Sequence, residues 1–93
     1  MATGSAAALL EDVEIKKIET EIKEVKEEIK KVETKIEKVE TNIESEKDAK
    51  EKQQLNERLN IILREKQQLR TVEQQLNERL NMFLRRQQQQ QNG

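Results

Sequence analysis

The side chains that could take part in acid–base chemistry are nineteen carboxylates, because the 93 residues include no histidine and no cysteine. This composition excludes disulfides, imidazole or thiolate metal sites, and nucleophiles that depend on either residue. The carboxylates alternate with lysine along segments typical of exposed helix, where no pocket positions a substrate. We therefore expect no enzymatic activity, no cofactor and no metal site.

Arginine is the second residue type that could bind a ligand, and all the arginines lie in the C-terminal half of the chain. They are Arg58, Arg64, Arg70, Arg79, Arg85 and Arg86. They are spread around a helix and interleaved with glutamate, Phe83 is the only aromatic residue, and the net charge of the chain is −1. Because clustered positive charge binds phosphates and aromatic side chains stack on bases, a nucleic-acid-associated helix is a weak functional hypothesis, although catalysis is weaker still.

The spacing of the apolar residues is more informative. From Ile15 to Ile43 they recur at alternating steps of three and four, and the residues between them are Lys, Glu, Thr or Asn. This heptad pattern predicts a helix with one narrow apolar stripe, which is stable only against another helix. With a and d as the apolar heptad positions, the predicted seam residues are Ile15, Ile22, Ile29, Ile36 and Ile43 at a, and Ile18, Val25, Val32 and Val39 at d.

A second heptad segment follows, and it contains an internal repeat. The octapeptide QQLNERLN occurs at 53–60 and again at 74–81, three heptads later, so that both copies face the same side of a helix. The predicted seam residues are Leu55, Ile62, Leu69, Leu76 and Phe83 at d, and Leu59 and Leu80 at a. The other a positions hold Lys52, Lys66 and Glu73, which either set the register by facing an opposite charge or are tolerated imperfections of the repeat.

The apolar stripe widens at RLNIILR (58–64) and RLNMFLR (79–85). Ile61, Leu63, Met82 and Leu84 lie outside the a and d positions there, in two patches about 31 Å apart along a helix. Two interpretations remain open. Further helices of a bundle, or the first helix folded back, cover the patches, or the patches form a docking face on which a partner helix binds.

The two heptad registers are out of phase by two residues across residues 44–52. Either one long helical rod is locally distorted there, or a turn folds the second helix back on the first. The absence of Gly and Pro favours the rod, whereas Ser45 and Asp48 are potential N-caps of a new helix. Residues 1–50 hold fourteen acidic and ten basic side chains (net −4) and residues 51–93 hold five and eight (net +3), which favours an antiparallel hairpin.

The sequence therefore predicts an all-α coiled coil with heptad-repeat helices at 8–44 and 51–86, joined by a register break or turn at 45–50. The helices form either a hairpin that assembles into a bundle or one rod. Residues 1–7 and the Gln-rich tail at 87–93 lack seam residues, and we predict that they are disordered.

The predicted function is structural. The chain is expected to form a homo-oligomer through its seam, with two to four helices per bundle layer, and to serve as a scaffold or assembly module. The alternative is an adaptor that receives a partner protein on the apolar patches at 59–63 and 80–84. The sequence has neither a signal-peptide pattern nor the ~20 consecutive apolar residues of a membrane span, so we expect a soluble, intracellular protein.

Overall fold

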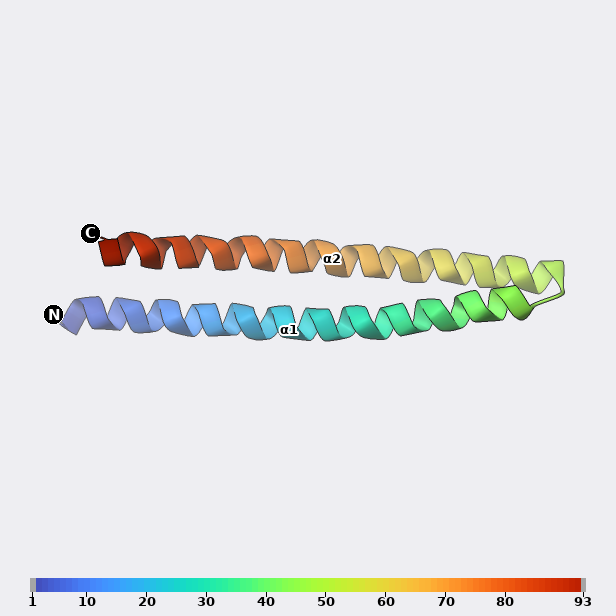
Figure 1. Ribbon diagram of the computed structural model, residues 1–93, viewed down its shortest axis with the longest axis horizontal. Coiled ribbons are helices and arrows are strands. Elements are labelled where there is room, and N and C mark those ends of the chain that lie inside the picture. The colour runs from blue at the N-terminus through green and yellow to red at the C-terminus, as the bar shows by residue number, and fades with distance from the viewer. Residues whose placement is uncertain (1, 93) are drawn as a thin grey trace.

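The chain forms an antiparallel helical hairpin in the computed structural model, which describes residues 2–92, with side chains described for residues 10–89 (Figure 1). Helix α1 (Ala2–Ser45) leads through the turn at 46–48 into helix α2 (Ala49–Asn92), which runs back alongside α1. The two ends of the chain lie at the same end of a molecule that measures 72 × 15 × 14 Å. The prediction of an all-α, two-helix coiled coil is confirmed, in its hairpin form rather than as a rod.

Both helices extend beyond the boundaries predicted from the heptads. Residues 2–7 and 87–92, for which we predicted disorder, are helical, while residues 1 and 93 lie outside the described part of the chain. Alanines at 6–8 and glutamines at 87–91 are good helix formers, and the chain contains no proline that could stop either helix. Extending an existing helix adds one hydrogen bond per residue, so propensity carries each helix past its last seam residue.

The turn uses Asp48 as the N-cap of α2. Its Oδ1 accepts a hydrogen bond from the backbone N–H of Lys50 at 3.1 Å, and its carbonyl accepts one from the N–H of Lys52 at 2.9 Å. Ser45, the other predicted cap, instead donates from Oγ to the carbonyl of Asn42 at 3.2 Å within the last turn of α1. Of the two candidates, Asp48 therefore starts the second helix.

The same turn closes without glycine because its backbone needs no unusual conformation. No residue in the described part of the chain has a positive φ angle. Glu46 bridges the two helices: its N–H donates to the carbonyl of Ile43 at 3.3 Å, and its Oε1 accepts from the N–H of Asp48 at 3.1 Å. The side chains of Glu46 and Asp48 thus satisfy backbone groups that a tight turn would otherwise leave unpaired.

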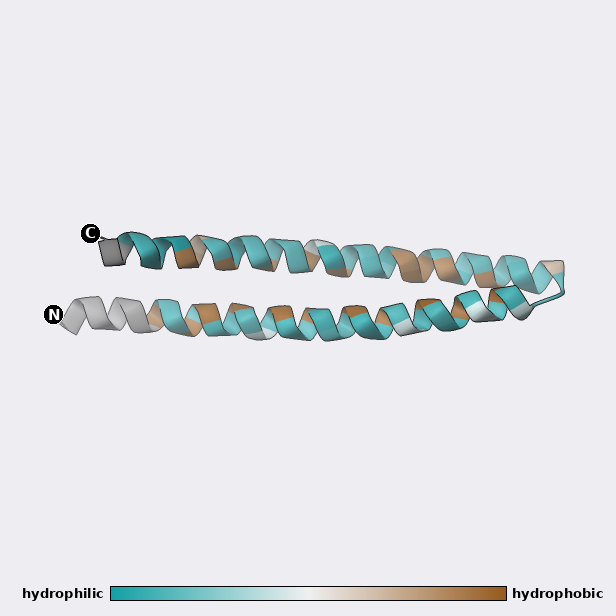
Figure 2. Cartoon of the chain, viewed as in Figure 1, coloured by the Kyte–Doolittle hydropathy of each residue, from teal (hydrophilic) through white to brown (hydrophobic). Residues whose placement is uncertain are grey.

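The apolar stripes of the two helices face each other along the hairpin (Figure 2). Between residues 49 and 89, every a and d side chain from Leu55 onward is buried or half-buried, and every other side chain is exposed. The buried core consists of Ile15, Ile18, Ile22, Ile29, Val32, Ile36, Val39 and Ile62. The residues that the heptad spacing assigns to the seam are therefore buried or half-buried in both helices, because residues three and four apart share one helix face.

The two helices contribute unequally to this core. Seven of the eight buried residues belong to α1, and α2 supplies only Ile62. The α2 residues Leu55, Leu59 and Leu69 pack against the central cluster but stay half-buried. The hairpin consequently leaves more apolar surface uncovered on α2 than on α1.

Candidate functional site

The sixteen predicted seam residues all lie between the two helices of one chain. Eight of them are the buried core, and the other eight are half-buried: Val25, Ile43, Leu55, Leu59, Leu69, Leu76, Leu80 and Phe83. Burial of each side chain contributes roughly 1.5–3 kcal/mol, so this seam is the main source of the hairpin's stability. Because the two helices of one chain form the seam, the seam does not require a second molecule, although its half-buried residues keep part of their surface exposed.

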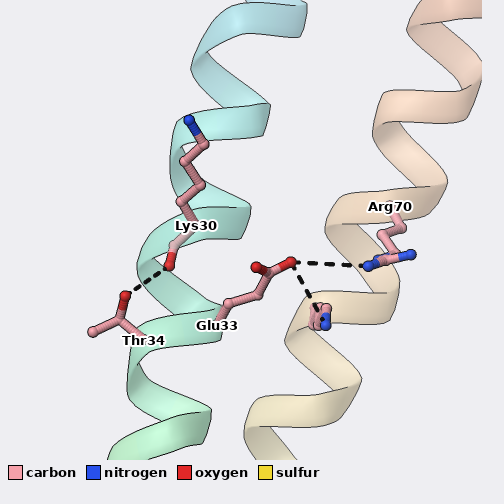
Figure 3. A network of polar contacts seen from close by, with 5 residues as sticks. Lys30, Glu33, Thr34 and Arg70 are labelled. Atoms are coloured by element: carbon pink, nitrogen blue, oxygen red, sulfur yellow. Dashed lines mark hydrogen bonds and ion pairs between the residues drawn. The ribbon is translucent and has the colours of Figure 1, made fainter.

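The polar a positions of α2 are partly accommodated by charge pairing. Glu33 of α1 reaches across to α2, where its Oε1 lies 3.6 Å from Lys66 Nζ and 3.8 Å from an Arg70 guanidinium nitrogen (Figure 3). Lys66 therefore faces an opposite charge, as the register hypothesis requires. Side chains this exposed form ion pairs worth about 0–1 kcal/mol, so the network orients the helices more than it stabilises them.

Two faces of α2 flank the seam, and they differ in chemistry. We define the groove face as heptad positions c and g of α2 from Gln54 to Gln89, which are the residues two after and one before each a position. The ion-pair face comprises positions e and b, and it includes Arg70 with its contact to Glu33. These definitions follow from the a positions at Leu59 and Leu80.

The four predicted patch residues are all exposed, but they are divided between these faces. Ile61 and Met82 lie on the groove face with 58% and 57% of their surface accessible. Leu63 and Leu84 lie on the ion-pair face, 43% and 41% exposed. Each sequence patch thus places one apolar residue on either side of the seam, and the hairpin covers neither side.

Sequence reasoning missed other exposed apolar residues. Val72 lies on the groove face between Ile61 and Met82 and is 41% exposed, and Leu10 and Val13 are exposed on α1. Val72 could have been found as an apolar residue at a g position in a segment otherwise rich in Gln and Arg. Its spacing of eleven and ten residues from its two neighbours is close to three helical turns, so the three form one stripe.

The groove face is hollowed where it meets α1. One groove of ≈ 470 Å³ has an apolar floor of Val32, Leu69 and Val72. The neighbouring groove of ≈ 450 Å³ is lined by Val39, Ile61 and Ile62, among others. Lys35 and Glu65 border both grooves. A third hollow of ≈ 410 Å³ continues towards the turn and is lined mainly by polar side chains. The first two grooves offer apolar walls but no cluster of catalytic groups.

The arginines are distributed rather than gathered into one basic face. Arg58 borders a groove, Arg70 pairs with Glu33, and the Arg86 guanidinium lies over the Phe83 ring, 5.8 Å from its centroid. Phosphate binding is favoured by clustered positive charge, which these three positions do not supply. Within residues 2–92, no group of three or more acidic side chains could hold a metal ion.

Comparisons with known proteins do not assign the chain to a family: no protein-family model, curated protein or solved structure matches it. In the described part of the chain, neither helix combines the length and the apolar character needed to cross a membrane. The functional argument therefore depends on the surface of the hairpin itself.

Proposed function

We propose that this protein is a structural assembly module, a helical hairpin that associates with further copies of itself through α2. One observation carries the proposal: the hairpin leaves five large apolar side chains of α2 exposed after its own seam is filled. They are Ile61, Leu63, Val72, Met82 and Leu84. Three of them, Ile61, Val72 and Met82, recur on one face about every three helical turns, and an exposed apolar stripe of this kind is typical of a surface covered by another helix.

The shape of the hairpin supports the same proposal. Two helices form a layer only 14–15 Å thick, in which most α2 seam residues stay half-buried. Adding helices from a second hairpin gives a four-helix bundle, in which leucines at d gain cover that two helices cannot supply. The driving force is burial of apolar surface, worth about 25 cal/mol per Å² removed from water.

Sedimentation equilibrium from the micromolar to the millimolar range tests the proposal. The chain mass is 11.0 kDa, and we expect the weight-average mass to rise to at least twice that value with concentration. The hydrophobic dye ANS should bind the dilute monomer and be displaced as association proceeds. A mass that stays at 11.0 kDa over the whole range contradicts self-association.

A second function, that of an adaptor, is favoured by the exposure of Ile61 and Met82. Both side chains are more than half exposed, and methionine adapts to differently shaped partners. An adaptor differs in the same experiment, because it remains monomeric and keeps binding ANS at every concentration. If the chain stays monomeric and keeps binding ANS, we infer that the exposed α2 residues bind a helix of another protein instead of a second copy.

A further inference from the structure

We propose that the partner of the groove face is the groove face of a second copy, packed antiparallel around a two-fold axis at Val72. This inference rests on the proposed function and specifies its surface. A two-fold interface requires a face that is complementary to itself, because every contact occurs twice with the two copies exchanged. The groove face has this property except at its outer pair of arginines, Arg58 and Arg86. A prime marks a residue of the second copy.

The apolar residues of the groove face match under this symmetry. Heptad geometry in an antiparallel pair centred on Val72 places g opposite g′ and c opposite c′. Val72 then meets its own copy at the axis, and Ile61 lies opposite Met82′ on one side and Met82 opposite Ile61′ on the other. The three most central apolar side chains of the face, 41–58% exposed in the single hairpin, are covered together.

The polar residues between them match as well. Glu65 lies opposite Arg79′, so the symmetric dimer contains this acid–base pair twice. Gln68 faces Gln75′, and a pair of amides can donate and accept hydrogen bonds mutually. The outer pair of Arg58 and Arg86′ is the like-charged exception, and it lies near the ends of the contact, where charges remain solvated.

The ion-pair face is less suited to the same contact. Its centre holds Arg70, whose guanidinium is bound to Glu33, and Lys66 shares that carboxylate. Covering this network removes three charged groups from water, at a cost that its long 3.6–3.8 Å contacts do not offset. The groove face instead has two hollows, each lined by three apolar side chains among charged and polar ones, with Lys35 and Glu65 bordering both.

The size of the face sets the expected affinity. From Gln54 to Gln89 it is about 52 Å long and about one helix diameter, 10 Å, wide. This amounts to roughly 1,000 Å² over the two copies, the lower limit for a specific interface. We therefore expect a dimer that forms in the micromolar range and dissociates on dilution.

Single cysteines test the axis, because the natural chain contains none. Val72→Cys should form a disulfide-linked dimer under mild oxidation, since two thiols at a two-fold axis come within disulfide reach. Ile61→Cys and Met82→Cys should link efficiently only when the two variants are mixed. Gln74→Cys, at the centre of the ion-pair face, is the matched control and should stay unlinked.

Each other result overturns the proposal. Linkage of Gln74→Cys without Val72→Cys places the contact on the ion-pair face, and linkage of Ile61→Cys alone makes the helices parallel. Absence of linkage in a solution whose mass is dimeric refutes the groove-face axis while self-association stands. Absence of linkage together with a monomer mass refutes both.

A pair of charge substitutions gives an independent readout. Val72→Lys and Leu63→Lys alter side chains of matched exposure, 41% and 43%, on opposite faces of α2. Val72→Lys places two like charges at the axis and should weaken dimerisation at least about tenfold, whereas Leu63→Lys should change it by less than about threefold. Both variants should keep wild-type helicity at low concentration. Equal weakening by the two, or a larger effect of Leu63→Lys, contradicts the assignment.

Discussion

Ile29 illustrates how strongly single residues determine this fold, because it lies in the seam with only 8% of its surface exposed. The residues beside it in the sequence, Glu28 and Lys30, are exposed. A chain of such narrow cross-section has no deeper core to compensate for a lost seam residue. Its stability therefore depends on a line of side chains rather than on a volume.

Replacing Ile29 with Asp should abolish the cooperative melting transition of the hairpin. The substitution places an unpaired carboxylate in the middle of the seam, at a cost of several kcal/mol that is comparable to the total stability of a small domain. Lys30→Asp, one residue away and exposed, is the control and should melt close to wild type. Thermal circular dichroism checks both, and an unchanged melting curve for Ile29→Asp contradicts the seam.

Lys66 allows the reverse substitution, in which an apolar residue replaces a charged one in the seam. Its side chain is 26% exposed at an a position and pairs with Glu33 at 3.6 Å. Lys66→Leu should stabilise the hairpin by about 1 kcal/mol, because apolar burial in the seam exceeds the value of a solvent-screened ion pair. Lys30→Leu, outside the seam, should have no comparable effect. Denaturant unfolding measures the difference, and a loss of stability on Lys66→Leu shows that the Glu33 network contributes more than we infer.

At the scale of the elements, the turn determines that the two helices of one chain pack against each other. Residues 46–48 separate segments of 44 residues each, so a helix of this length can fold back on its neighbour along its full extent. Near the open end of the hairpin, Gln87 Nε2 donates a hydrogen bond to Asp12 Oδ1 at 2.7 Å. Contacts between the helices thus extend from the turn to the first residue of the Gln-rich tail.

The Asp48 cap should account for a measurable part of the turn's stability. Asp48→Ala removes the acceptor of the Lys50 N–H and should cost about 1 kcal/mol, a typical value for loss of an N-cap. Ser45→Ala removes only a bond to a carbonyl within α1 and should cost less than about half as much. Urea unfolding compares the two, and equal effects contradict the assignment of Asp48 as the single cap of α2.

At the scale of the whole molecule, the hairpin is 72 Å long and thin, and its apolar side chains lie mainly between the two helices. Within residues 10–89, five of the seven exposed large apolar side chains lie on α2, and the other two, Leu10 and Val13, lie on α1. This distribution is the reason why we propose α2 as the helix that binds a second copy. A groove face that is satisfied by one second copy closes the assembly as a dimer, because an isologous contact leaves no free equivalent surface.

Spin labels at Lys17 and Arg85 measure the hairpin directly. Adjacent packed helices are about 8–10 Å apart, so the labels within one chain should lie within roughly 25 Å, including the label arms. In a continuous helix the same residues are roughly 100 Å apart. Labelled chains should be diluted into excess unlabelled protein, so that distances between chains do not contribute. A population near 100 Å contradicts the hairpin.

The heptads alone predicted much of this molecule. The step of three and four from Ile15 to Ile43, and the repeat from Leu55 to Phe83, determine which side of each helix is apolar. A side chain returns to the same face only after seven residues, so this assignment needs no tertiary information. Asp48 was likewise recognisable as a cap candidate from its residue type and its position at the register slip.

The tertiary structure decided which surfaces the seam covers and which it leaves open. A heptad stripe has the same pattern whether its partner helix belongs to the same chain or to another, and only the turn at 46–48 makes the contact intrachain, at a small entropic cost for so short a loop. The exposure of Ile61, Leu63 and Val72, and the groove that Val72 lines, depend on where α1 lies against α2. Sequence periodicity determines the direction of a side chain from its own helix axis, whereas its exposure depends on the position of the other helix.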